Sequence, residues 1–296
     1  MTITIRELSK TYKGGVTALD GVSMEIPTGM FGLLGPNGAG KSTMIKILAT
    51  LLEPSSGEVV VDGLDVSKDR RKIRSRLGYL PQEFGVYPKM KAQEFLDFVA
   101  RMNGLSSKSE RNRRVDQMLE KVGLAEAARR KVKALSGGML RRLGIAQALI
   151  GEPKLLIVDE PTVGLDPEER IRFRGLLQDI GREIVIILST HIVGDISSTC
   201  ENLVILDRGK LRYQGSPPEL TAMAQGKTWE TVAEEKDLPE IKRRFSVIST
   251  APRGDRLHLR LVGEGSANGL ELKPVSPNLE DAYINFMGGL EEEDND

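Results

Sequence analysis

The feature that most constrains the fold is the stretch GMFGLLGPNGAGKSTMIKILATLL at residues 29–52. An apolar run leads into a glycine-rich segment that fits G-x-x-x-x-G-K-[ST], and a helix-forming run follows it. In this pattern backbone N–H groups curl around phosphate oxygens, and the start of the helix adds its positive partial charge. Lys41 reaches the outer phosphates, and the Ser42 hydroxyl can bind Mg²⁺. The sequence therefore predicts strand, phosphate loop and helix rather than a plain glycine-rich turn, and leaves kinases, GTPases and ATPases open.

Strands and helices alternate through residues 1–220. Continuous apolar runs such as KLLIVDE at 154–160 are typical of parallel strands buried on both faces. The alternation predicts an α/β fold with a parallel core sheet. Strands are expected at residues 2–8, 22–26, 29–35, 57–63, 154–160, 183–190 and 202–210, and helices at 41–52, 167–181 and from about 192.

A helical block interrupts this alternation from about residue 89 to residue 150. Two segments show the i, i+3, i+4, i+7 spacing that places side chains on one face of a helix. The first contains Phe95, Phe98, Val99 and Met102, and the second contains Val115, Met118, Leu119 and Val122.

A second, smaller domain is expected at residues 226–296. Its segments 227–234, 244–250 and 256–262 alternate like strands, and APRGD at 251–255 is the expected turn between the last two. The final six residues, EEEDND, are expected to be a solvated, disordered tail. The residues do not tell what this domain does, and a purely structural or dimer-stabilising role is the simplest interpretation.

Composition excludes several classes of protein. The 296 residues include 42 basic and 42 acidic side chains, so there is no electrostatic argument for nucleic acid as a bulk partner. Cys200 is the single cysteine, which excludes a disulfide framework and favours a reducing compartment. The N-terminal segment lacks the apolar region of a secretory signal, and runs such as IVIIL at 184–188 are too short to span a bilayer. If the protein acts at a membrane, another chain must cross it.

Two adjacent acids, Asp159 and Glu160, close the apolar strand at 154–160. Ligands of parallel sheets bind at the carboxyl ends of the strands. Because adjacent strand residues point to opposite faces, one acid is expected to orient the Mg²⁺ shell and the other to polarise an attacking water. An ordinary strand end before Pro161 is the alternative, and the phosphate loop makes it the weaker one.

A second candidate anion site lies at LSGGM, residues 135–139. Ser136 can cap the helix that starts there, and a capped helix is the structural alternative. The glycines favour a ligand, since they allow close approach of a backbone. One catalytic pocket needs only one phosphate loop. The second site therefore serves either another nucleotide or the nucleotide held by another copy of the chain, and spacing does not choose between the two.

The order of the motifs resembles that of the ATP-binding subunit of an ABC transporter. The phosphate loop (Walker A), Gln82 in GYLPQ, LSGGM, LLIVDEPTVGLDP and His191 in LSTH follow one another, and the resemblance covers about residues 1–220. It implies a P-loop NTPase fold with a parallel core sheet, a small antiparallel β subdomain, an inserted helical subdomain at about 89–150 and a small C-terminal α+β extension. It also implies that two copies pair head to tail, each ATP lying between the phosphate loop of one copy and the LSGG stretch of the other.

The resemblance assigns roles residue by residue. Glu160, His191, Gln82 and Lys41 are the expected catalytic residues, and Ser42, Gln82 and Asp159 the expected ligands of Mg²⁺. His191 would hydrogen-bond the γ-phosphate, and Tyr12 would stack on adenine unless it is only a strand-edge tyrosine. Asp166 can both cap a helix before Pro167 and lie in the loop that crosses the dimer interface. The expected ATP-binding residues are Tyr12, Gly35, Pro36, Asn37, Gly38, Ala39, Gly40, Lys41, Ser42, Thr43, Ser136, Gly137, Gly138 and Asp166.

One position departs from the family pattern, because Met139 stands where the family has Gln and brings no amide. The stretches at 49–66, 137–153 and 277–288 look most similar to ATPase subunits of drug- and antibiotic-resistance exporters with a separate membrane subunit. The resemblance thus implies ATP and Mg²⁺ as cofactors, a second copy and a polytopic membrane protein as partners, and a place on the cytoplasmic side of the cell membrane.

Two other functions stay open at this point. One is a non-transport ABC ATPase acting on a soluble assembly, although such proteins usually carry two ATPase domains or a long coiled-coil insertion. The other is a module that only senses nucleotide, against which the intact Asp159, Glu160 and His191 argue.

Overall fold

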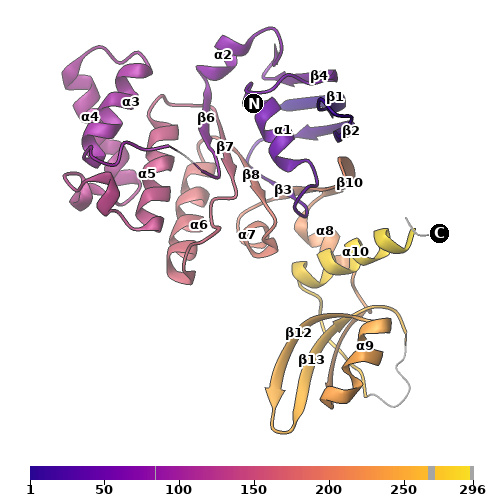
Figure 1. Cartoon of the computed structure of the whole chain (residues 1–296). Coiled ribbons are helices and arrows are strands. Elements are labelled where there is room, and N and C mark those ends of the chain that lie inside the picture. Colours follow the sequence, from indigo (N-terminus) through magenta and orange to yellow (C-terminus); the bar gives the residue numbers. More distant parts are fainter. Residues whose placement is uncertain (84, 266–270, 294–296) are drawn as a thin grey trace. The chain divides into compact units, whose positions relative to one another are not determined.

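A computed structural model describes residues 1–83, 85–265 and 271–293 (Figure 1). The chain forms two compact units, Met1–Gln214 and Gly215–Asp296. The boundary lies a few residues before the expected position 220. The reason is helix α8 (Pro217–Ala222), which packs on helix α10 (Leu279–Glu293) of the second unit and buries Leu220.

The first unit is built around a six-stranded sheet in the order β10-β9-β3-β8-β7-β6. Strands β6, β7, β8, β3 and β9 pair in parallel, as predicted for the core. All residues of β3, β7 and β8 are buried, which explains their uninterrupted apolar sequences. The strands are β3 (Met30–Leu34), β6 (Leu77–Leu80), β7 (Leu155–Asp159), β8 (Val185–Thr190), β9 (Asn202–Asp207) and β10 (Lys210–Gly215).

An antiparallel sheet, in the order β2-β1-β4-β5, forms the second layer of this unit. Its apolar side chains, Ile3, Ile5 and Val59 among them, share one core with Leu33 of β3 and Ile45 of α1. Its strand β2 contacts the phosphate loop, because Ala18 lies against Gly40. The elements are β1 (Ile3–Thr11), β2 (Thr17–Ile26), β4 (Ser56–Val61), β5 (Leu64–Asp65) and α1 (Lys41–Leu48).

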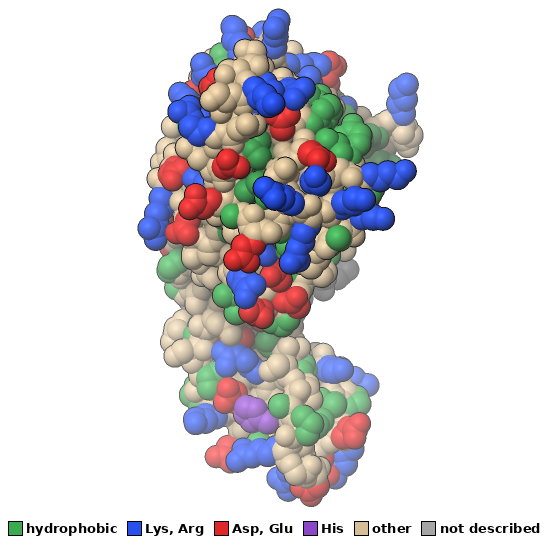
Figure 2. Space-filling model, turned by 90° about the vertical axis from the view of Figure 1, so that its left-hand side faces the viewer, with side chains coloured by type: hydrophobic (Ala, Val, Ile, Leu, Met, Phe, Trp, Pro, Cys, Tyr) green, Lys and Arg blue, Asp and Glu red, His purple; other side chains and the backbone are tan. Residues whose placement is uncertain are grey.

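The predicted helical block forms α3 (Ala92–Met102), α4 (Lys108–Lys121) and α5 (Gly137–Leu149), preceded by the short α2 (Arg70–Arg74). On α3 the inward face differs from the one suggested by spacing. Phe95 and Leu96 are buried, whereas Phe98 and Met102 are 37% and 73% exposed. Figure 2 looks onto this side of the unit, where basic and acidic side chains are interspersed and hydrophobic side chains gather toward one edge.

Two further helices, α6 (Pro167–Gly181) and α7 (Val193–Ser197), follow β7 and β8. Helix α6 has the predicted bounds because the Asp166 carboxylate accepts from the Glu169 N–H at 2.9 Å and Pro167 occupies the first helical position. No helix within the described residues is both long and apolar enough to cross a membrane.

The second unit is a four-stranded sheet, in the order β12-β13-β11-β14, with helices α8, α9 (Leu238–Arg244) and α10. Its small core contains Ile241, Phe245, Leu259 and Leu261. The three predicted strands are present as β11 (Thr228–Ala233), β12 (Ser246–Arg253) and β13 (Arg256–Val262), and β14 (Lys273–Pro274) is added to them.

Two expectations for this unit need correction. Arg253 pairs with Arg256, so the predicted five-residue turn narrows to two residues, with Gly254 at φ 67°. Helix α10 continues to Glu293, so the predicted disordered tail is helical over its first three residues. The last three residues, 294–296, lie outside the described part of the chain.

Candidate functional site: a phosphate-binding pocket at the carboxyl end of the core sheet

A pocket of about 510 Å³ lies where strands β3, β7 and β8 end. It brings together eleven of the residues expected to bind nucleotide or act on it. They come from four separate segments, which the parallel sheet aligns at one edge. The pocket is lined by Ala18, Pro36, Asn37, Gly38, Ala39, Gly40, Lys41, Ser42, Thr43, Gln82, Glu160, Val163 and His191.

Two glycines of the phosphate loop are required by close backbone contacts. Gly35 has φ 155° and Gly40 φ 103°. A Cβ at these positions would lie 2.2 Å from the Leu206 carbonyl oxygen and 2.4 Å from the Ala18 carbonyl oxygen, respectively. The loop is thus wedged between β9 and β2, and only glycine allows this course. Gly35 itself does not line the pocket. Its role is to let the backbone pass close to the Leu206 carbonyl oxygen.

Lys41 stands at the base of the pocket and is buried. Its ammonium group donates to the carbonyl oxygens of Gly35 at 2.7 Å and Pro36 at 3.0 Å, and its Nζ lies 3.6 Å from Glu160 Oε1. Burial lowers the pKa of Lys41, while the nearby Glu160 and Asp159 carboxylates oppose that shift. A cation held this way is positioned before any phosphate arrives, which reduces the ordering cost of binding.

Glu160 connects the two sides of the pocket. Its Oε2 lies 2.9 Å from His191 Nδ1, and the residue is 6% exposed. Its backbone has φ 47°, a left-handed conformation that is strained for a glutamate. The turn takes the chain out of β7 immediately after Asp159, while the Glu160 N–H still donates to the Ser189 carbonyl oxygen at 2.9 Å. Strain of this kind, tolerated at a pocket, is a feature of functional sites.

Asp159 is 4% exposed, and its Oδ1 has no hydrogen-bond partner among the described residues. The Ser189 hydroxyl, on the paired strand β8, is buried as well. Burial raises the pKa of Asp159, and the nearby Glu160 carboxylate adds to that shift. An unpaired buried carboxylate oxygen is the kind of hard donor that suits Mg²⁺, although Asp159 does not itself line the pocket that contains Ser42 and Gln82.

Gln82 lines the pocket, whereas Tyr12 lies outside its lining and contacts Thr43 of the phosphate loop. Tyr12 follows β1 and is 39% exposed, with its hydroxyl 3.2 Å from Thr43 Oγ1. Its ring is therefore held beside the phosphate loop and open to solvent, as a stacking residue would be. The carbonyl oxygen of Gln82 accepts from Arg141 of α5 at 2.5 Å, which connects this loop to the helical block.

The second candidate anion site is not part of this pocket. Ser136 Oγ accepts from the Met139 N–H at 3.2 Å and so caps α5, as its structural interpretation requires. Gly138 is explained by packing, because a Cβ there would lie 2.1 Å from Glu169 Oε2 of α6. Gly137 is exposed, and among the described residues outside its own helical turn a Cβ added to it would have no neighbouring atom within 4 Å. Of the two glycines, only Gly137 is left without a structural reason.

Sequence reasoning missed one buried network beside the pocket. Asp195 of α7 is fully buried and accepts hydrogen bonds from Thr162, Thr190 and Arg174. The signal that could have found it was an acid in a short apolar stretch four residues after His191. Such acids are rarely buried without a partner.

Known proteins share this architecture. The family described as ABC transporter matches residues 19–163. The linearmycin resistance ATP-binding protein LnrL of Bacillus subtilis is 32% identical over 302 residues, covering 95% of this chain and 96% of LnrL. The methionine import ATP-binding protein MetN of Geobacillus kaustophilus is 39% identical, over 72% of this chain and 65% of MetN.

Solved structures agree with the sequence relatives. The dimer of the ATP-binding cassette MJ0796 in a post-hydrolysis state, bound to ADP and Pi, aligns with a TM-score of 0.66 and 28% identity. The alignment covers 72% of this chain and 98% of that one. The chain therefore belongs to the ABC transporter family, as an ATP-binding subunit and an ATPase.

Proposed function

We propose that this protein is the ATP-hydrolysing subunit of a membrane exporter and works as a head-to-tail dimer of two copies. The observation that carries the proposal is the buried Glu160, held between Lys41 and His191 at the mouth of the phosphate pocket. A pocket that only sensed nucleotide would not need a strained carboxylate held between the lysine of the phosphate loop and a histidine.

Within this proposal each side chain has a task. Lys41 and the N–H groups of the phosphate loop hold the β- and γ-phosphates. Glu160 orients and polarises the attacking water, with His191 holding its carboxylate and reaching the γ-phosphate. Ser42, Asp159 and Gln82 are the residues that would hold Mg²⁺, which supplies neutralisation of the phosphate charge.

The second anion site completes the pocket from another copy. Helix α5 begins at Gly137 and presents the positive end of its dipole together with the Ser136 hydroxyl. Both Ser136 and Gly137 lie at the surface of the single chain. We place these residues, with Asp166, against the γ-phosphate held by the other copy. ATP would then join two surfaces that are otherwise apart.

The substitution Glu160→Gln tests this mechanism. The amide keeps the shape of the side chain but cannot act as a base, so ATP should bind, persist and hold the two copies together. Light scattering after size exclusion should show a dimer with ATP and a monomer with ADP. Glu168→Gln, at an exposed position on α6, is the matched control. It should have the same ATP turnover, and the same molar mass with ATP and with ADP, as the unaltered protein. A folded Glu160→Gln protein that stays monomeric in saturating ATP would contradict the proposal.

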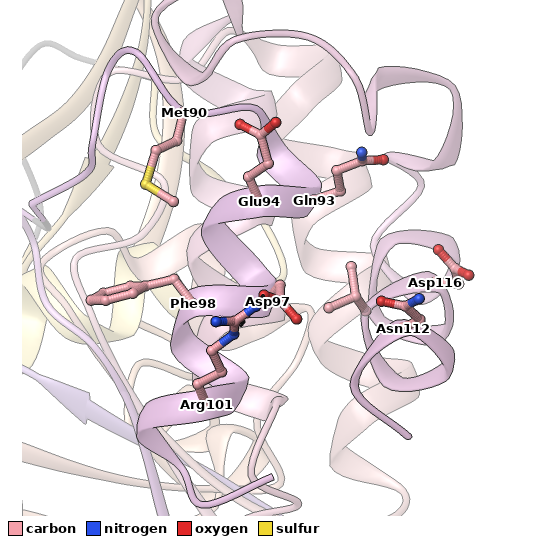
Figure 3. A pocket seen from close by; sticks show the side chains of 9 residues that line it. Met90, Gln93, Glu94, Asp97, Phe98, Arg101, Asn112 and Asp116 are labelled. Carbon is pink, nitrogen blue, oxygen red and sulfur yellow. Dashed lines mark hydrogen bonds and ion pairs between the residues drawn. The ribbon is translucent and has the colours of Figure 1, made fainter. Parts of the chain in front are cut away.

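We place the contact with the membrane subunit on the helical block. A pocket of about 610 Å³ lies between α3 and α4 (Figure 3) and is lined by Met90, Gln93, Glu94, Asp97, Phe98, Arg101, Asn112, Val115 and Asp116. Tyr87 is 53% exposed beside it, and its ring contacts Phe98 edge to face at 5.5 Å between centroids. Exposed aromatic side chains at a polar-rimmed hollow suit a short helix of the partner. Tyr87 beside this surface follows Gln82 of the phosphate pocket by only five residues in the chain.

The substitution Phe98→Ser tests the placement. It removes an exposed ring and should leave ATPase activity of the isolated protein unchanged, while a polytopic membrane protein no longer copurifies from native membranes. Leu51→Ser, at another exposed apolar position, should keep the partner. Loss of the partner in both variants, or in neither, would place the contact elsewhere. Recovery of ribosomes or another soluble assembly with the unaltered protein would instead favour the non-transport alternative.

We base two further parts of the proposal, export as the direction of transport and peripheral attachment to the cytoplasmic face of the membrane, on similarity to the relatives. LnrL, named for antibiotic resistance, aligns over both units, whereas MetN, named for import, aligns over 72% of this chain. The alignment with a resistance protein thus extends into the second unit. Transport by the purified complex in vesicles would test direction: ATP supplied outside should drive substrate into vesicles whose ATPase face is outward.

A further inference from the structure

Asp195 occupies an unusual position, fully buried one helical turn after the histidine of the pocket. Both of its carboxylate oxygens are used. Oδ1 accepts from Arg174 Nε at 2.9 Å and from Arg174 Nη2 at 2.7 Å. Oδ2 accepts from the Thr162 hydroxyl and from the Thr190 hydroxyl, the latter at 3.4 Å.

The two threonines belong to different loops of the pocket. Thr162 lies two residues after Glu160, in the segment that leaves β7. Thr190 ends β8 and directly precedes His191, and its hydroxyl also accepts from the Ile192 N–H at 2.9 Å. One carboxylate oxygen therefore ties together the two segments that bring Glu160 and His191 to within 2.9 Å of each other.

The arginine supplies the charge that makes this arrangement stable. A carboxylate with no exposure is costly unless it is paired and fully hydrogen-bonded. Arg174 of α6 donates twice to one oxygen, which leaves the other oxygen for the two loops. A satisfied buried network of this kind restricts its members to one arrangement.

We propose that Asp195 is a positioning residue for ATP hydrolysis, which aligns the Glu160 loop with the His191 loop through the hydroxyls of Thr162 and Thr190. The assignment rests on the proposed roles of Glu160 and His191. Asp195 does not line the phosphate pocket, so it acts on turnover and not on nucleotide affinity.

The chain offers a matched control in its second unit. Asp281 is also fully buried and also accepts two hydrogen bonds from one arginine, from Arg260 Nε at 2.8 Å and Arg260 Nη2 at 2.6 Å. Loss of either acid therefore disrupts a comparable ion pair. Only Asp195 is hydrogen-bonded to loops of the pocket.

The experiment measures kcat, KM for ATP and thermal unfolding for Thr162→Val, Thr162→Ser, Asp195→Asn and Asp281→Asn. Thr162→Val removes one hydroxyl and leaves the Asp195–Arg174 pair intact. We expect kcat to fall about tenfold or more, as small misplacements of reacting groups do, with KM changed by no more than about twofold. Thr162→Ser should restore kcat. Asp195→Asn should lower kcat in the same way, and Asp281→Asn should lower thermal stability alone.

Several results would overturn the proposal. One is an unchanged kcat in folded Thr162→Val. Another is a loss of kcat that Thr162→Ser does not restore, and a third is an equal loss of kcat in Asp281→Asn. The Glu160→Gln variant distinguishes failure of the positioning role of Asp195 from failure of the proposed function. If Glu160→Gln still turns over at the normal rate, the role of Glu160 is wrong; if it is inactive while Thr162→Val is active, only the positioning role is wrong.

Discussion

The pair Gly137→Ala and Gly138→Ala separates a structural glycine from one needed by a ligand. Gly137 is the first residue of α5, and a Cβ there would have no atom of another described segment within 4 Å. Alanine is the better helix former, so Gly137→Ala should stabilise the isolated protein by about 0.5 kcal/mol. For a unit of this size, that raises the melting temperature by about 1–2 °C.

Gly138 should behave in the opposite way. A Cβ there would lie 2.1 Å from Glu169 Oε2 and 2.6 Å from its carboxyl carbon. Glu169 cannot withdraw freely, because Arg142 and Arg172 lie 3.5 Å and 3.2 Å from its carboxylate oxygens. Gly138→Ala should therefore destabilise the protein by about 1–3 kcal/mol, the usual range for overpacking.

The functional readout is ATP-driven dimerisation in a Glu160→Gln background. In the proposed head-to-tail dimer, the methyl group added in Gly137→Ala would lie where the phosphate of the other copy approaches α5, so dimerisation should weaken by about tenfold or more, equal to about 1.4 kcal/mol. Stability is measured by denaturant unfolding without nucleotide, and mass by light scattering with ATP. A Gly137→Ala protein that is more stable and still dimerises at the same ATP concentration would refute the reasoning, since the glycine would then have no ligand role.

Three further predictions concern single sites. Lys41→Met removes the cation to which we assign the outer phosphates, so ATP affinity measured by calorimetry should fall at least about a hundredfold; unchanged affinity would exclude the assigned role. Arg260→Met leaves the buried Asp281 without its partner and should cost about 3–5 kcal/mol in the second unit, seen in its urea transition but not in ATP binding. Burial raises the pKa of Cys200 to about 12, so iodoacetamide should label the native protein far more slowly than the unfolded one at pH 8. The pKa of the Cys200 thiol is higher in the folded than in the unfolded protein. Its contribution to the free energy of unfolding is therefore fully present below the unfolded pKa and declines as the pH rises above about 9.

Local structure was predicted well wherever neighbouring residues encode it. The strand, glycine loop and helix around Lys41 are consecutive, and so are the cap, proline and apolar face of α6. The three strands of the second unit followed from alternation in the same way. The errors arose at the ends of helices and in the assignment of their buried faces, where tertiary packing overrides local preference. Helix α10 continues into the acidic segment, and Phe98 faces outward although its spacing matched that of Phe95.

The sequence by itself determined the phosphate loop, the succession of strands and helices, and the identity of the residues expected in the pocket. The phosphate loop and the succession of elements depend on backbone preference and on periodicity over a few consecutive residues. Tyr12, Gln82, Asp166 and His191 were expected only because the order of the motifs resembles that of a known family. Only the tertiary structure decided that Glu160 lies between Lys41 and His191. It also decided that Asp195 is hydrogen-bonded to both the Glu160 loop and the His191 loop. It also showed that packing explains Gly138 but not Gly137. These relations join residues far apart in the chain, and their distances follow from the order β3-β8-β7 in the sheet, which no local pattern records.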